Sequence, residues 1–163
     1  MSEQYEYFVK AAPPYTEDRP SGLWRRLGEQ WDYLSLLDWE WHSVGEAGVQ
    51  SPPSPQVLYP VSAERAAVLE ADRQGWVRYW ARYTDLQDWE EGELPTTVVR
   101  RRQSPDRVLD EAFLVGDTWG ATRSIFDFFD PRPSSPPHLV EITPDEAEGL
   151  LQELRGVTGA TEL

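Results

Sequence analysis

The sequence predicts an α+β fold, in which an antiparallel sheet is built from two diverged repeats, each with a β-hairpin, a strand and a helix. The first reason is a series of short runs, rich in aromatic and β-branched residues, that alternate with Gly and Pro turns. The second is a gapless match between residues 58–75 and 139–156, each a short strand followed by a capped helix. The predicted repeats are residues 1–75 and 76–163, together forming one compact unit.

The first repeat contains four predicted strands and one helix. Ser62 is a typical N-cap residue and Gly75 a typical stop, so we expect a helix over residues 63–74. The run SLLDWEW at residues 35–41 fits a short helix or a strand. The predicted strands are residues 5–10, 22–27, 30–34 and 58–61, the middle two forming a hairpin around the turn at 28–29.

The second repeat follows the same order with more residues before its hairpin. Thr143 caps a predicted helix over residues 144–155, with Pro144 at the favoured first position and Gly156 as the stop. The run SIFDFF at residues 124–129 again fits a helix or a strand, and residues 85–92 form an acidic loop. The predicted strands are residues 76–83, 96–102, 108–114, 118–121 and 139–142.

We interpret the matching order of the two halves as an internal duplication. The alternative is that any strand followed by a capped helix resembles any other. The two helices differ, because the second has an apolar stripe at Ala147, Leu150, Leu151 and Leu154, whereas the first has Glu70 and Arg73 at the last two places. The further matches are Ser62 with Thr143, GEQW at 28–31 with GDTW at 116–119, and SLLDW at 35–39 with SIFDF at 124–128.

The second half resembles a small group of actinobacterial acidic proteins with no assigned activity. The residues that carry this resemblance are the Trp-bearing strand from Trp76, TTVVRR at 96–101, the hairpin that ends in Trp119, DFF at 127–129 and LVEITPDEA at 139–147. The resemblance implies no reaction, cofactor or catalytic residue.

Composition narrows the classes of function. The net charge is −14, from 29 acidic and 15 basic side chains, which disfavours binding to nucleic acid and suits a basic protein partner or simply solubility. The chain has no cysteine, which excludes disulfides and thiolate chemistry. No apolar run approaches the roughly 20 residues of a membrane span, and the first residues lack the pattern of a secretion signal. We therefore expect a cytoplasmic protein without a membrane partner.

Titratable side chains offer few candidates for catalysis. His42 and His138 do not occupy matching repeat positions, and neither has a partner at helical spacing. Asp38 and Asp127 do match, and a pair of carboxylates facing each other would suit general acid–base work. A capping or turn role is the simpler interpretation of these aspartates. Arg25–Arg26 and Arg100–Arg102 fit an anion clamp, although pairing with carboxylates across neighbouring strands is simpler.

The acidic loop provides the best candidate for an interface. Trp89 lies in this loop, where an aromatic side chain can anchor a partner or fold back to cover the base of its own loop. The spacing of the acidic residues does not follow a calcium-binding loop. Trp31 and Trp119, which match between the repeats, are expected in the core. The predicted partner-binding residues are Trp89, Asp85, Asp88, Glu90 and Glu91.

Known catalytic and nucleotide-binding motifs are absent from the sequence. It contains no Gly-rich phosphate loop, no GxSxG elbow and no HExxH pair, so we assign no catalytic residue, cofactor or metal. The sequence therefore predicts a non-catalytic protein-binding module of the immunity or antitoxin type, with an acidic surface for a basic protein. The alternative is a small-molecule-binding protein or an unrecognised enzyme, with its site between the repeats near Asp38, Asp127 and the arginines.

Overall fold

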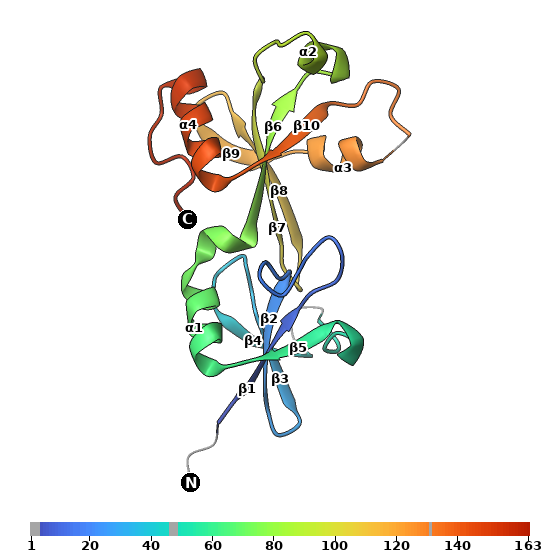
Figure 1. The fold of residues 1–163 in the computed structure, drawn as a ribbon, viewed down its shortest axis with the longest axis vertical. Coiled ribbons are helices and arrows are strands. Elements are labelled where there is room, and N and C mark those ends of the chain that lie inside the picture. The colour runs from blue at the N-terminus through green and yellow to red at the C-terminus, as the bar shows by residue number, and fades with distance from the viewer. Residues whose placement is uncertain (1–3, 46–48, 131) are drawn as a thin grey trace. The chain divides into compact units, whose positions relative to one another are not determined.

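The computed structural model describes residues 4–45, 49–130 and 132–163, and within them it confirms an α+β fold with two five-stranded antiparallel sheets (Figure 1). The chain divides into two compact units. Unit 1 comprises Met1–Trp76 and Arg102–Val108, and unit 2 comprises Val77–Arg101 and Leu109–Leu163. The segment Arg102–Val108, predicted to lie in the second repeat, is thus grouped with unit 1.

Unit 1 contains one sheet whose strands follow the order β4-β3-β2-β1-β5. Residues Pro55–Val57 and Arg73–Trp76 form single 3-10 turns before β5 and after α1. The elements of unit 1 are β1 (Glu6–Lys10), β2 (Gly22–Leu27), β3 (Gln30–Leu34), β4 (Trp41–Ser43), β5 (Leu58–Val61) and α1 (Ala63–Ala71).

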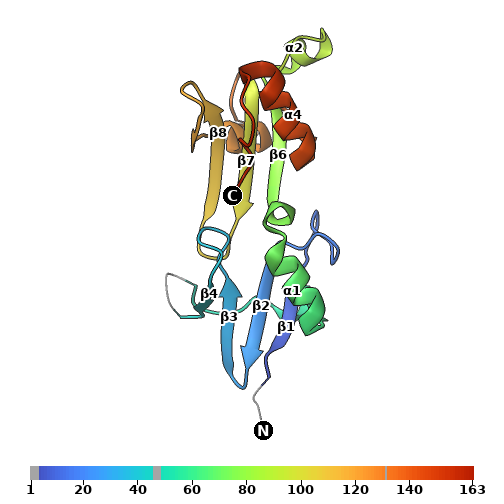
Figure 2. The same cartoon turned by 90° about the vertical axis from the view of Figure 1, so that its left-hand side faces the viewer.

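The two faces of this sheet carry different side chains, because successive residues of a strand point to opposite faces. One face packs against α1, which lies along β1 and β2 (Figure 2). The buried residues on this side are Val9, Leu23, Leu34, Leu36, Ala66, Leu69 and Trp76. Trp24, Tyr33 and Val49 form a second buried cluster, with Phe8 and Trp31 packed against it.

Unit 2 contains the second sheet, with the order β10-β6-β7-β8-β9. The helix α4 packs on β6, as Figure 2 shows. Trp80, Val99, Ala112, Ile125 and Leu139 form a buried cluster. The elements are β6 (Val77–Tyr83), α2 (Leu86–Glu90), β7 (Thr97–Gln103), β8 (Val108–Leu114), β9 (Thr118–Ala121), α3 (Ser124–Phe129), β10 (His138–Ile142) and α4 (Pro144–Arg155).

Capping residues determine where both long helices begin and end. Thr143 and Glu146 form a capping box at the start of α4, and Gly156 ends it with a left-handed φ of 67°. Ser62 caps α1 as predicted. The prediction that α1 continues to residue 74 is wrong: the helix ends at Ala71, and the Asp72 carboxylate accepts a hydrogen bond from the Gly75 N–H at 3.2 Å.

The ambiguous segments take different structures in the two units. Residues 35–40 turn the chain between β3 and β4, whereas residues 124–129 form α3. The acidic loop, predicted to be irregular, contains the short helix α2. Within the described residues, no helix is long and apolar enough to cross a membrane.

The two sheets share one topology. In each, the last strand pairs with the first, the remaining strands follow in order, and a helix after the last strand packs on the first. The motif matches upstream of the helices are wrong, however. Trp31 lies on β3, second from the sheet edge, whereas Trp119 lies on the edge strand β9. Both tryptophans are only partly buried. Common ancestry of the halves stays a hypothesis.

Candidate functional site

Helix α2 organises the predicted interface residues. Asp85 is its N-cap: one carboxylate oxygen accepts a hydrogen bond from the Asp88 N–H at 2.8 Å. The Asp85 carboxylate therefore has a structural role, and it is half-buried, as is Asp88. Glu90 and Glu91 are exposed, and the Gln87 amide donates to Glu91 at 3.0 Å. The fold thus places all five predicted residues within one helix and its caps.

Trp89 is held from one side and open on the other. Its ring lies 4.6 Å from the His138 ring, at an interplanar angle of 33°. The Trp89 side chain nevertheless keeps 43% of its surface exposed. Contact with a ring of the first residue of β10 restricts the indole, so that little side-chain entropy is lost when a partner covers its free face.

His138 links α2 to α3 through a series of ring contacts. The Phe128 ring packs edge-on against His138 at 5.6 Å, and Phe129 lies 5.0 Å from Phe128. We call these four residues, Trp89, Phe128, Phe129 and His138, the aromatic cluster. From the sequence alone, His138 is considered only as a candidate catalytic residue. Its role here depends on the β6–β10 register, which places it opposite Tyr83.

Exposed apolar side chains lie on α2 and α3, the helices that carry most of the aromatic cluster, and in the chain that follows α2. Leu86, one helical turn before Trp89 on α2, is 49% exposed, and Phe129 on α3 is 57% exposed. Leu94 after α2 and Phe126 on α3 are also exposed. Single exposed apolar residues are ordinary, but several on neighbouring elements are a feature of interaction surfaces.

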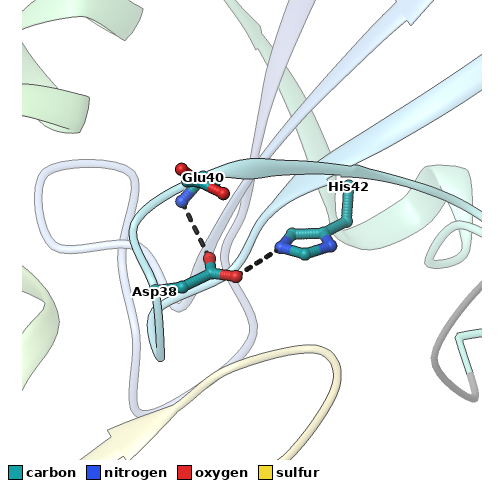
Figure 3. Close-up of side chains that lie close together, drawn as sticks. All are labelled: Asp38, Glu40 and His42. Carbon is teal, nitrogen blue, oxygen red and sulfur yellow. Dashed lines mark hydrogen bonds and ion pairs between the residues drawn. The ribbon is translucent and has the colours of Figure 1, made fainter.

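A second candidate group lies in unit 1, with Asp38 and Glu40 on the turn between β3 and β4 and His42 on β4. Figure 3 shows Asp38, Glu40 and His42 close together: His42 Nε2 is 2.7 Å from one Asp38 oxygen, and the other accepts the Glu40 N–H at 2.9 Å. The turn role predicted for Asp38 is confirmed. The pairing with His42 depends on a left-handed φ of 65° at Trp39, which the sequence does not reveal.

The charge state of Asp38 follows from these contacts. Burial raises the pKa of its carboxyl, but the hydrogen bonds from the Glu40 N–H and from His42 outweigh burial and hold the pKa below its usual value. One potential ligand atom from each of Asp38, Glu40 and His42 lies within 4.8 Å of the others. Two carboxylates and an imidazole suit a divalent cation chemically, although Asp38 and Glu40 are exposed.

Asp127 and several arginines form ion pairs. Asp127 lies in the first turn of α3 in unit 2, with an oxygen 3.9 Å from Arg123, and the N-cap of this helix has no side-chain capping hydrogen bond. The predicted pairing of arginines across strands is confirmed at four positions. The pairs are Arg25 with Asp32 at 2.9 Å, Arg26 with Glu6, Arg100 with Glu111 at 3.1 Å and Arg101 with Asp110 at 2.7 Å.

Comparison with protein-family models, curated proteins and solved structures finds no match for this chain. The two candidate groups, on α2–α3 and on the β3–β4 turn, are therefore weighed on their geometry alone.

Proposed function

We propose that this chain is a non-catalytic protein-binding module that uses the surface formed by α2 and the aromatic cluster. The observation that carries the proposal is Trp89: its ring is restrained by His138, yet nearly half of the side chain is exposed. Large aromatic residues that are already ordered are the usual anchors of protein interfaces. Leu86 and Phe129 extend the same apolar surface.

Charge indicates what kind of partner fits this surface. Glu90 and Glu91 are exposed beside Trp89, and the whole chain carries a net charge of −14. The corresponding partner surface has an apolar pocket for the indole and a basic rim. An acidic protein that neutralises or escorts a basic partner, as immunity proteins and antitoxins do, fits this description.

The experiment uses a partner captured from the native host, followed by kinetics on purified components. We expect Trp89→Ala to speed dissociation roughly thirtyfold, because a buried anchor contributes about 2 kcal/mol or more. Neutralising the rim should instead slow association roughly tenfold and weaken its salt dependence. The rim variant carries Asp85→Asn, Asp88→Asn, Glu90→Gln and Glu91→Gln, since asparagine retains the N-cap.

Matched controls separate a local contact from a general effect. Tyr59→Ala removes an exposed aromatic residue from β5 and should leave dissociation unchanged. The charge control neutralises four exposed carboxylates elsewhere, at Glu17, Asp18, Glu29 and Glu153. If this control slows association as much as the rim variant does, the acidic rim is not the contact. If Trp89→Ala and Tyr59→Ala behave alike, α2 is not the anchor and the proposal fails.

A further inference from the structure

We propose that a cavity in unit 1 binds a small carboxylate with a short apolar body. The cavity has a volume of about 200 Å³. It lies at the end of the β1–β2 pair, and residues of the Arg102–Val108 segment form its other wall. Pockets for drug-sized ligands usually exceed about 300 Å³, so this one suits a small metabolite.

Lys10 provides the charge. It is the only lysine in the sequence, and it lies in the cavity wall on the last residue of β1. Among residues 4–45, 49–130 and 132–163, no carboxylate lies within ion-pair distance of its ammonium group. An anionic ligand would supply an ion-pair partner.

Trp24 contributes a buried donor to the same wall. Only 3% of the residue is exposed, and within the described part of the chain its indole N–H has no hydrogen-bond partner. The neighbouring wall residue is Gly22, where an added Cβ would lie 3.1 Å from the indole nitrogen. Glycine therefore keeps the indole N–H side of the cavity open. A buried N–H without an acceptor is costly, and a ligand oxygen would satisfy it.

The remaining polar groups of the cavity wall indicate the sign of the charge that a ligand would carry. Gln103 accepts a hydrogen bond from the Tyr15 hydroxyl at 3.2 Å through its side-chain oxygen, which leaves its amide NH₂ as a donor. Ser104 is already engaged, since its oxygen accepts from the Leu36 N–H at 2.8 Å. The Ser21 hydroxyl is also engaged, since it donates to the Lys10 carbonyl at 3.3 Å. The donors left for a ligand are thus an ammonium, an amide NH₂ and an indole N–H.

The number of positive charges and the apolar wall narrow the ligand class. A single ammonium group balances a monoanion better than the dianion that inorganic phosphate forms at mildly alkaline pH, where the titration is run. Pro105 and Val108 complete the wall with apolar surface, which suits a short hydrocarbon body. A monocarboxylate of a few carbons satisfies both conditions. This site and the α2 surface involve separate residues, so either proposal can fail alone.

The test is a titration of the full chain with butyrate, inorganic phosphate and butylamine at constant ionic strength. The readout is the indole N–H resonance of Trp24, assigned with a Trp24→Phe variant. We expect butyrate to shift this resonance saturably, and phosphate and butylamine to leave it unchanged. Lys10→Met should weaken butyrate binding roughly tenfold or more, and Lys10→Arg should retain most of it.

The variants also provide the results that would overturn the proposal. Lys10→Met keeps the length and apolar stem of the side chain, so an unchanged melting temperature confirms that its fold is intact. Gly22→Ala, which places a methyl group against the Trp24 nitrogen, should abolish the shift. Butyrate binding that survives Lys10→Met, a saturable response to phosphate in place of butyrate, or no response of Trp24 to any probe would each refute the inference.

Discussion

Truncation of Leu151 should destabilise unit 2 by about 3–4 kcal/mol. Leu151 is fully buried on α4, with Ala147 one turn before it also at 0% exposure. Leu151→Ala removes about three buried carbon groups, worth roughly 0.8 kcal/mol each in transfer free energy. The cavity left behind adds about 1 kcal/mol or more, because the side chains around a buried site relax only in part.

The assay must distinguish the two units, because a single unfolding midpoint would average them. Hydrogen exchange followed by mass spectrometry provides this resolution. We expect faster exchange in α4 and β6 of Leu151→Ala, with little change in α1. Val68→Ala is the matched control: Val68 is 57% exposed on α1, so its truncation should change stability by no more than about 0.5 kcal/mol.

Leu150→Ala provides an intermediate point, because Leu150 is only half-buried on the same helix. Its cost should fall between those of Leu151→Ala and Val68→Ala. Equal and mild effects of Leu150→Ala and Leu151→Ala would refute the reasoning, since α4 would then not be docked through the buried face that the structure shows.

Three further predictions concern polar contacts. Burial raises the pKa of Glu148, but hydrogen bonds from the C-terminal segment 157–163 hold it below its usual value. The stabilisation is therefore present above the ordinary pKa and lost as pH falls through the folded pKa, and Glu148→Gln should remove this pH dependence from hydrogen exchange of that segment. The pKa of the Asp38 carboxyl is likewise held below its usual value, in part by the hydrogen bond with His42. His42→Ala should therefore move the NMR titration midpoint of Asp38 upward. Asp85→Ala should cost α2 about 1 kcal/mol by helix exchange rates, whereas Asp85→Asn should cost little.

Signals between neighbouring residues in the sequence predict correctly where the two long helices start, but they misplace the end of α1. Ser62 and Thr143 cap their helices through side-chain hydrogen bonds to the backbone three residues later, an interaction that depends only on neighbouring residues. The end of α1 depends on Asp72, whose carboxylate binds the Gly75 N–H and stops the helix before the expected glycine. Glu70, which stands where the second helix has an apolar residue, accepts a hydrogen bond from the Trp41 indole N–H at 3.2 Å.

The candidate sites depend more strongly on long-range contacts. An aspartate at the N-cap, three residues before Asp88, is a sequence signal for α2, but the loop composition obscures it. The contact between Trp89 and His138 joins residues 49 positions apart and follows from β6–β10 pairing. The pairing of Lys10 with Gly22 across β1 and β2, which lines the unit 1 cavity, likewise depends on strand register.

The duplication hypothesis matches different strands of the two halves once strands are compared by their position in each sheet and not by sequence motif. The β2–β3 hairpin of unit 1, closed by the short turn at residues 28–29, then corresponds to β7–β8 of unit 2, whose strands are longer. Part of the difference in length between the halves therefore falls in that second hairpin, which spans residues 97–114 where the first spans 22–34. Its tip is the segment Arg102–Val108, which is grouped with unit 1 and supplies Gln103 and Pro105 to the cavity wall. If the halves share an ancestor, the ligand site therefore depends on a feature in which the two copies differ, and shortening the β7–β8 tip should abolish butyrate binding while the α2 surface keeps its partner.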